Sequence, residues 1–383
     1  MRITHVDVAV IGGGIAGASA AAELAAERRV LLLEREGQPG YHTTGRSAAL
    51  LTPFYGNAVV RALNLAGARW YRQPPADFTD TPLLRPRGEL YVGREQDRDL
   101  VDAEVDKARA VGAPAERLDR AAIRAKVPAL RAEWAAHGWF DASAADMDVA
   151  AILQGFLRRL RRRGGEVRIA AEVLGLERSG EGWSITLRDG RVRAAMVVDA
   201  AGAWADPIAA LAGLPPLGIA PLRRTAIIVA PPVGHAIADW PGVADIAETW
   251  YVKPDAGKLL CSPADETPSE PCDAQPDELD VAICADRVQQ AFDIEIRRIE
   301  HRWAGLRCFA PDRTPVVGFD PLVEGFFWLA GQGGYGIMTA PVLATLTACL
   351  IAGRELPGWL AGIDPAALAP DRAALRRSGA API

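Results

Sequence analysis

Three glycines near the N-terminus have the spacing of a phosphate-binding turn. Gly12, Gly14 and Gly17 follow an apolar run that reads as a strand and open an alanine-rich run that reads as a helix. The first glycine of such a turn permits the tight bend, the second lets the backbone approach a pyrophosphate, and the third lets helix and strand pack closely. The N-terminus of the helix then faces the phosphate charge. The pattern predicts a dinucleotide-binding site.

A carboxylate follows where the ribose of a dinucleotide is expected. Glu34 ends the apolar run Val30–Leu33, which reads as a second, parallel strand. An acid at this point can accept hydrogen bonds from both ribose hydroxyls. A glycine turn that only packs a helix on a strand would not require an acid at residue 34. The glycine turn and Glu34 together therefore favour dinucleotide binding.

Two later segments indicate which dinucleotide binds. The buried strand that includes Met196–Asp199 ends in small residues, among them Ala201 and Gly202, which permit close approach of a ligand. Near the C-terminus, Phe327–Ala330 reads as a strand, and a glycine-rich turn after it opens the last helix. A helix N-terminus there can stabilise negative charge on a reduced flavin. Glycine turns at both ends of the chain, closing one site, favour FAD over NAD.

Around these turns the chain predicts an α/β fold: a Rossmann-like FAD-binding domain of the glutathione-reductase type and a substrate domain on a mixed, largely antiparallel sheet. Residues 1–80, 145–215 and 303–383 are assigned to the FAD domain. Residues 81–144 and 216–302 are assigned to the substrate domain. Hydrophobic periodicity predicts these helices: 15–27, one ending near residue 71, 97–111, 148–163, 279–292 and 337–352. Short strands are expected at 88–93, 166–170, 183–188 and 193–198, with Asp189-Gly190 as a hairpin turn.

Composition excludes several classes of protein. Lysine and arginine number 43 against 48 acidic residues, a net charge of −5, which argues against a nucleic-acid partner. The five cysteines lack ligand spacing, so we expect no metal site and no disulfide framework, and a reducing cytoplasm fits best. No stretch reads as a membrane span. We expect a cytoplasmic protein, peripheral at the membrane if its electron acceptor is a quinone.

Several motifs together resemble the D-amino-acid oxidase/glycine oxidase superfamily, and most closely its bacterial FAD-dependent D-arginine dehydrogenases. The resemblance covers nearly the whole chain in order. It rests on residues 41–49, Tyr55, residues 200–204, Arg223-Arg224, residues 251–255, residues 303–307 and residues 331–336. It implies noncovalent FAD, hydride transfer from the α-carbon of a D-amino acid to flavin N5, and hydrolysis of the imino acid to a 2-oxo acid and ammonia.

The resemblance also implies roles for single residues. Arg224 and Arg307 clamp the substrate carboxylate, Tyr251 hydrogen-bonds it, and the Gly334 carbonyl orients the amine. Tyr55 lies on a mobile loop over the pocket, and Glu89 meets a cationic side chain. The cofactor contacts expected from turns and resemblance together are Gly12, Gly14, Ile15, Ala16, Gly17, Glu34, Arg35, Thr44, Gly45, Arg46, Ser47, Ala48, Val173, Ala201, Gly202, Trp204, Gly331, Gly333, Gly334, Tyr335, Gly336, Ile337 and Met338.

Two positions depart from the D-arginine enzymes. Leu50 stands in place of a histidine and Met338 in place of a glutamine, which makes the pocket floor less polar. We therefore expect both basic and hydrophobic D-amino acids as substrates. Cys308 follows Arg307 directly, so strand alternation turns it away from the site and favours noncovalent FAD.

The residues alone leave three functions open: oxidation of amino acids, oxidation of another carboxylate substrate by a related enzyme, and flavin binding without turnover. Paired guanidiniums suit any substrate with a carboxylate, since they form planar, charge-assisted hydrogen bonds. A 2-hydroxy-acid or N-methyl-amine oxidising enzyme of the same superfamily would use the same clamp. A flavin-binding protein without turnover is the third. The electron acceptor, a quinone or oxygen, also stays open.

Overall fold

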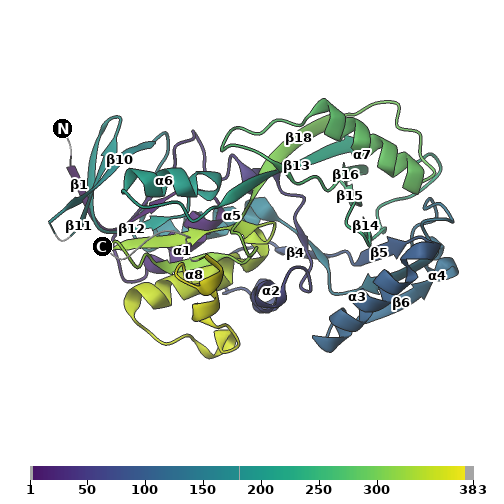
Figure 1. Ribbon diagram of the computed structural model, residues 1–383, viewed down its shortest axis with the longest axis horizontal. Coiled ribbons are helices and arrows are strands. Elements are labelled where there is room, and N and C mark those ends of the chain that lie inside the picture. Colours follow the sequence, from purple (N-terminus) through teal and green to yellow (C-terminus); the bar gives the residue numbers. More distant parts are fainter. Residues whose placement is uncertain (1–2, 181, 376–383) are drawn as a thin grey trace.

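The structure, a computed structural model, describes residues 3–180 and 182–375. Two large sheets stand side by side, each with its own helices (Figure 1). The chain leaves the first sheet for the second and returns to it twice. Sites between the sheets are therefore built from segments that lie far apart in the sequence.

The first sheet has the parallel strands predicted for a dinucleotide fold. β1 (Ile3–Ile11) pairs in parallel with β2 (Val30–Leu33) on one side and with β12 (Gly190–Asp199) on the other. All four residues of β2 are buried, as expected of a parallel strand covered on both faces. The remaining strands of this sheet are β9 (Glu166–Arg168), β10 (Val173–Ser179), β11 (Gly182–Leu187), β19 (Val316–Phe319) and β20 (Phe326–Ala330).

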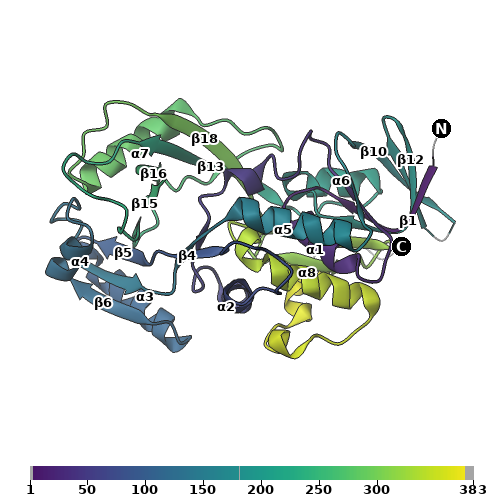
Figure 2. The ribbon, with the colours of Figure 1, turned by 180° about the vertical axis from the view of Figure 1, so that it is seen from behind.

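Helices cover the first sheet and bring the two glycine turns together. α1 (Ile15–Leu24) packs against α5 (Val149–Arg162) and α8 (Gly336–Ala352), and α2 (Ala58–Arg72) packs against α8 (Figure 2). α6 (Ala205–Leu211) contacts β10 and β12. The α2–α8 crossing needs Gly67, because a Cβ there would collide with the Met338 carbonyl oxygen. These contacts place the N-termini of α1 and α8 beside one another.

The second sheet is mixed and largely antiparallel, as predicted. Its order is β21-β18-β13-β16-β15-β14-β5-β7-β6, with β17 on β13, and within it only β14 and β5 pair in parallel among the described strands. Helices α7 (Glu278–Ala291) and α3 (Arg98–Ala110) pack on it, together with α4 (Arg120–Lys126). The bounds are β5 (Glu89–Gly93), β6 (Ala115–Asp119), β7 (His137–Asp141), β13 (Ala220–Val229), β14 (Gly242–Asp245), β15 (Tyr251–Asp255), β16 (Lys258–Ser262), β17 (Thr267–Pro268), β18 (His301–Phe309) and β21 (Gln332–Gly333).

A small third sheet joins the two large ones. It consists of β3 (Leu50–Leu51), β8 (Ala145–Met147) and β4 (Leu84–Pro86), in that order. None of the described helices is long and apolar enough to cross a bilayer.

Some elements differ from the sequence-based expectation. β18 pairs with β13 along its whole length. Judged by the strands of the second sheet, the boundary of the substrate domain lies after Phe309, whereas the sequence placed it before residue 303. β10 was not predicted, because a register shift between Val173 and Gly175 interrupts its alternation. The short elements β6, α4 and β7 were also not predicted, and helix α1 ends at Leu24 instead of residue 27.

Candidate active site

A cavity of about 390 Å³ opens at the carboxyl ends of β1, β2 and β12. Its walls also include residues of β13, β15 and β18, so both large sheets contribute. Ligands of open α/β sheets bind at this edge of the strands. The first glycine turn, Glu34 and the C-terminal glycine turn all lie on its wall.

The first glycine turn has the backbone that each glycine was predicted to supply. Gly12 has a φ of +105°, and a Cβ on Gly17 would collide with the Gly12 carbonyl oxygen. A Cβ on Gly14 would approach only Thr44 Oγ1, at 3.3 Å. The first turn of α1 contains no acidic residue. Gly12 and Gly17 therefore serve the bend and the helix–strand contact, while Gly14 leaves space beside a positive helix end for an anionic group.

Glu34 is held in place by backbone donors. Its Oε2 accepts the Gly13 N–H at 2.7 Å and its Oε1 accepts the Glu36 N–H at 2.8 Å. Each carboxylate oxygen has a further lone pair. The carboxylate is thus oriented and can still accept hydrogen bonds from a ribose.

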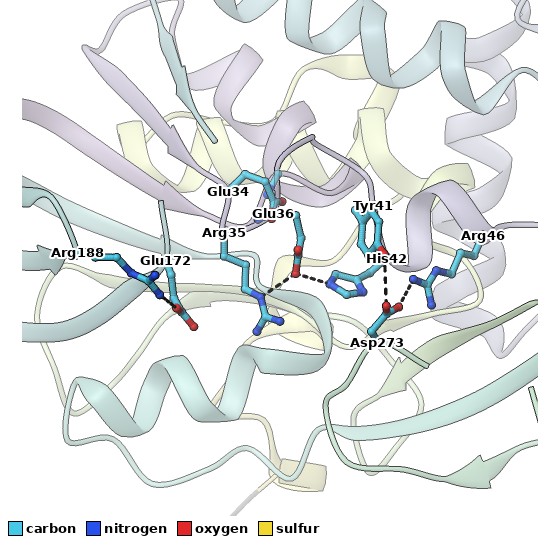
Figure 3. Close-up of polar contacts among 10 residues, drawn as sticks. Glu34, Arg35, Glu36, Tyr41, His42, Arg46, Glu172, Arg188 and Asp273 are labelled. Atoms are coloured by element: carbon cyan, nitrogen blue, oxygen red, sulfur yellow. Dashed lines mark hydrogen bonds and ion pairs between the residues drawn. The ribbon is translucent and has the colours of Figure 1, made fainter. Parts of the chain in front are cut away.

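Flat side chains line the wall beside Glu34. The Arg35 guanidinium lies 4.3 Å from the centroid of a Trp204 ring, and the His42 ring lies 4.7 Å from it. Glu36 accepts a hydrogen bond from Arg35 at 2.9 Å and contacts His42 Nε2 at the same distance (Figure 3). The arrangement presents stacked planar groups where the adenine end of FAD is expected.

The loop between β17 and α7 is hydrogen-bonded to the cavity wall. Asp273 accepts hydrogen bonds from Tyr41 and Arg46 (Figure 3), and Arg46 also donates to the Ala274 carbonyl at 2.8 Å and the Ala304 carbonyl at 3.0 Å. Arg46 therefore joins the first glycine-turn region to the second sheet.

The opposite end of the cavity is closed by the C-terminal glycine turn. Gly331 and Gly333 have positive φ, and the first turn of α8 has neither an acidic residue nor a side-chain cap. Gln332 Nε2 and His42 Nδ1 are buried without a partner among the described residues, and both side chains lie on the wall. Two positive helix ends, unpartnered polar atoms and a glycine cradle fit FAD.

Two arginines meet beyond the α8 turn. Leu222 opposes Arg307 and Gly305 opposes Arg224 in the β13–β18 register, so both guanidiniums leave the same face of the sheet. Arg307 makes no side-chain hydrogen bond or ion pair with the described residues, and a Cβ on Gly334 would lie 3.1 Å from its Cζ. Tyr251 lies on the same cavity wall.

Arg224 is anchored from behind. Its Nε donates to the Asp265 carbonyl at 2.8 Å and its Nη2 lies 3.2 Å from Glu266 Oε1. Glu266 also pairs with both terminal nitrogens of Arg313. Burial and the neighbouring Arg307 lower the pKa of Arg224. The single carboxylate of Glu266 thus faces three arginines, Arg224, Arg307 and Arg313. The site keeps a net positive charge, which suits an anionic group.

Tyr55 closes this site from the side of α2. Its ring centroid lies 5.6 Å from that of Tyr335, and burial raises its pKa while Arg307 and Arg224 act in the opposite direction. Gly56, the next residue, has a φ of +92°. The fold thus brings Tyr55, Arg224, Tyr251, Arg307 and Gly334 together.

The expected cofactor contacts line the cavity with four exceptions. Gly17 and Gly45 serve backbone contacts, since a Cβ on Gly45 would lie 2.6 Å from the Gly40 carbonyl oxygen. Tyr335 packs on Tyr55, and the Met338 sulfur accepts the Thr52 N–H at 3.3 Å. These four residues shape the wall from behind.

Glu89 lies outside the cavity wall. Its carboxyl is buried and accepts a hydrogen bond from the Tyr91 hydroxyl at 2.7 Å, and the Tyr91 ring stacks on Trp139. Burial raises the pKa of Glu89 to about 7. A buried carboxyl under an aromatic pair is placed to hold Tyr91, and its contact with a substrate stays a prediction.

The raised pKa of Glu89 predicts a pH-dependent stability. Folded Glu89 keeps its proton up to a pKa of about 7, whereas the carboxyl in the unfolded chain has its ordinary pKa of 4.5. The free energy of unfolding therefore falls by about 3 kcal/mol as pH rises from 4 to 8. Glu89→Gln should gain stability over the parent across this window. Melting temperatures from pH 5 to 8 test it, with the exposed Glu116→Gln as control. A difference that does not grow with pH contradicts the assignment.

Cys308 bears on how FAD is held. It opposes Pro221 on the face away from Arg307, but, contrary to the expectation from strand alternation, it is among the residues that line the FAD cavity. It is buried, and burial raises its pKa to about 12. A protonated thiol is a poor nucleophile. We expect acid or heat to release intact FAD into the supernatant, measured by absorbance. Flavin that stays with the precipitated polypeptide would refute noncovalent binding.

Sequence reasoning missed the residues that support the clamp. Glu266 lies in a proline- and acid-rich loop and Arg313 follows β18, and no local pattern signals either. The structure also places His42 on the adenine-side wall.

Fold and site together define a FAD-binding oxidoreductase of the two-domain, Rossmann-like type. Residues 7–350 match the sequence profile described as "FAD dependent oxidoreductase", known as DAO. The chain therefore belongs to the DAO family of FAD-dependent oxidoreductases.

Similar proteins agree with this membership. Glycine oxidase of Geobacillus kaustophilus is 26% identical over 375 residues, covering 92% of this chain and 95% of the relative. The crystal structure of glycine oxidase from Geobacillus kaustophilus superposes with a TM-score of 0.83 at 23% identity, covering 94% of this chain and 98% of that chain. L-amino acid deaminase from Proteus vulgaris superposes with a TM-score of 0.81 at 17% identity, covering 96% and 97%.

Proposed function

We propose that the protein oxidises the bond between the α-carbon and the nitrogen of amino acids, D-amino acids foremost, to imino acids that hydrolyse to 2-oxo acids and ammonia. The observation that carries the proposal is the pair Arg224 and Arg307 on one face of β13–β18, in the cavity that fits FAD. Similarity to a glycine oxidase supports an amino-acid substrate. Bound FAD supplies the two-electron acceptor.

The clamp fixes the substrate through its carboxylate. Arg307 has no side-chain partner among the described residues, so its guanidinium is available for a planar, paired contact. Arg224 adds a second cation whose position is fixed by Asp265 and Glu266. Tyr251 can donate its hydroxyl to the same carboxylate. Holding one end of a small substrate in this way orients the α-carbon, which is a large part of such catalysis.

The amine must lose a proton before oxidation. A neighbourhood with an excess of guanidinium charge disfavours a second cation, so it lowers the pKa of the substrate amine. Gly334 lies next to Arg307, and we assign its carbonyl, as the family resemblance implies, to accept an amine N–H. No dedicated general base is required in this scheme.

Side-chain choice depends on the surface around the clamp. Leu50 and Met338 were expected to make the pocket floor less polar, but neither residue is on the wall of the FAD cavity, and Met338 is buried behind it. A hydrophobic substrate side chain is therefore proposed only from the departure of these two positions from the D-arginine enzymes, since buried apolar surface is worth about 25 cal/mol per Å². We propose broad specificity that includes hydrophobic side chains. Because the fold is also similar to that of an L-amino acid deaminase, the test compares D- and L-amino acids.

A substrate panel tests the proposal. Anaerobic bleaching of the bound flavin is measured with D- and L-amino acids, glycine, N-methylglycine and 2-hydroxy acids. We expect D-amino acids to bleach it fastest. Faster bleaching by N-methylglycine or 2-hydroxy acids would move the function to those relatives, and no bleaching by any compound would indicate a flavin-binding protein without this activity. Reoxidation by oxygen against a quinone then identifies the acceptor.

A further inference from the structure

A second cavity, of about 380 Å³, lies beside the clamp and has no role in the scheme above. Tyr55 and Tyr335 are on its wall, as are Tyr91 on β5 and Trp139 on β7. Tyr55 is also within electrostatic range of Arg224 and Arg307. A substrate held by the clamp therefore has this cavity next to it, with room for a side chain of several atoms.

Most charges on the wall of the second cavity cancel within the protein. Glu104 pairs with Lys107 at 2.7 Å. Asp312 pairs with Arg372 at 2.9 Å. Arg313 is held by Glu266, outside the cavity. Each of these groups therefore already has an ion-pair partner, although Arg313 shares Glu266 with Arg224.

Three charged groups on this wall have no ion-pair partner among the described residues: Arg61, Asp141 and Glu248. Arg61 donates to the Gly56 carbonyl at 3.1 Å. Asp141 is 2% exposed, and its Oδ1 already accepts the Ser143 N–H at 2.8 Å and the Ser143 hydroxyl at 2.5 Å. Glu248 is exposed and its carboxylate makes no described hydrogen bond. Glu248 is thus the accessible carboxylate of the cavity.

The backbone fixes Glu248 at this place. It has a φ of +56°, in the turn between β14 and β15, and its N–H donates to the Asp245 carbonyl at 2.8 Å. Asp245 also accepts the Thr249 hydroxyl. A non-glycine residue in the left-handed region is uncommon, and the turn holds it there. Partial burial raises the pKa of Glu248, while Arg224 and Arg307 act in the opposite direction, so the carboxylate lies near the clamp as well.

We propose that the second cavity receives the distal end of the substrate side chain, and that Glu248 selects a distal ammonium or guanidinium group there. The aromatic rings of Tyr55, Tyr91 and Trp139 supply a wall that also favours a cation. The family resemblance implied this contact for Glu89, whose carboxyl accepts the Tyr91 hydroxyl and lies outside the walls of both cavities. The inference rests on the proposed carboxylate clamp and adds a side-chain class to it.

Ligands that cannot be oxidised at an α-amine test the inference on the holoenzyme. 6-Aminohexanoate and hexanoate share a carboxylate and a chain, and only the first has a distal ammonium. Their Kd values follow from perturbation of the flavin absorbance spectrum. We expect about tenfold tighter binding of 6-aminohexanoate, a preference that Glu248→Gln removes while changing the Kd of hexanoate by less than about threefold.

Two further variants sharpen the result. Glu104→Gln alters a carboxylate whose charge Lys107 already cancels, and Glu89→Gln alters the buried carboxyl, so both should keep most of the preference. Loss of the preference in Glu89→Gln but not in Glu248→Gln would overturn the inference, as would equal binding of the two ligands by the parent. If the parent binds neither carboxylate, the clamp itself is refuted and the inference falls with it.

Discussion

Replacing Arg307 by alanine should lower kcat/KM for the best amino-acid substrate by roughly 30- to 1000-fold. The side chain has no internal partner among the described residues, so its removal leaves no orphaned carboxylate and acts on the ligand. An anionic substrate that loses one charged partner forfeits about 2–4 kcal/mol. Arg224→Ala should act similarly, and the double variant should cost less than the sum because both residues hold one group.

Arg223→Ala is the matched control for the clamp. Arg223 is adjacent in sequence but faces the other side of β13, where it pairs with Asp280 at 2.8 Å. Its replacement should leave kcat/KM within about threefold of the parent. If Arg307→Ala and Arg224→Ala both stay within that range as well, the assignment of the carboxylate clamp is incorrect.

Gly14→Val should weaken FAD binding by more than about 100-fold. A Cβ at Gly14 approaches only Thr44 Oγ1, at 3.3 Å, a contact that a small shift of Thr44 relieves, and the side chain fills the space beside the α1 N-terminus. Two charge-assisted hydrogen bonds to a pyrophosphate are worth about 1.5–3 kcal/mol each, and their loss accounts for the factor. Isothermal titration of apoprotein with FAD gives the affinity.

Gly17→Ala provides the contrast to Gly14→Val. A Cβ on Gly17 would collide with the Gly12 carbonyl oxygen, so this variant should lose melting temperature as well as FAD. A Gly14→Val protein that binds FAD with parental affinity would show that the pyrophosphate does not lie at this turn.

Local patterns predicted the cofactor site well, because each feature depends on neighbouring residues. Gly12, Gly14 and Gly17 act within one strand–turn–helix unit, and Glu34 ends the next strand. The helices α5, α7 and α8 also follow from hydrophobic periodicity to within two residues at each end. The shift at Gly175 shows the limit, because a bulge changes which residues face the core and hides β10.

The clamp depended on pairing between distant segments. Arg224 and Arg307 share a face only because Leu222 opposes Arg307 in the β13–β18 register, and spacing along the chain does not encode that register. Resemblance to a known family supplied both residues. It did not indicate Glu248, whose position depends on the β14–β15 turn. It also did not indicate that Glu89 lies outside both cavity walls and accepts a hydrogen bond from Tyr91.

The central claim is that the carboxylate clamp presents an α-amine for oxidation by bound FAD. It is tested most directly by mixing the holoenzyme anaerobically with D-methionine or with D-methioninamide, in which a neutral amide replaces the carboxylate. The amide also lowers the pKa of the α-amine, a change that by itself would favour oxidation. Flavin absorbance is followed, and 2-oxo acid and ammonia are quantified after reoxidation. The account predicts rapid bleaching by D-methionine with equal yields of both products, and bleaching at least about 30-fold slower with the amide. Equal rates for the two compounds, or bleaching without ammonia, would contradict it.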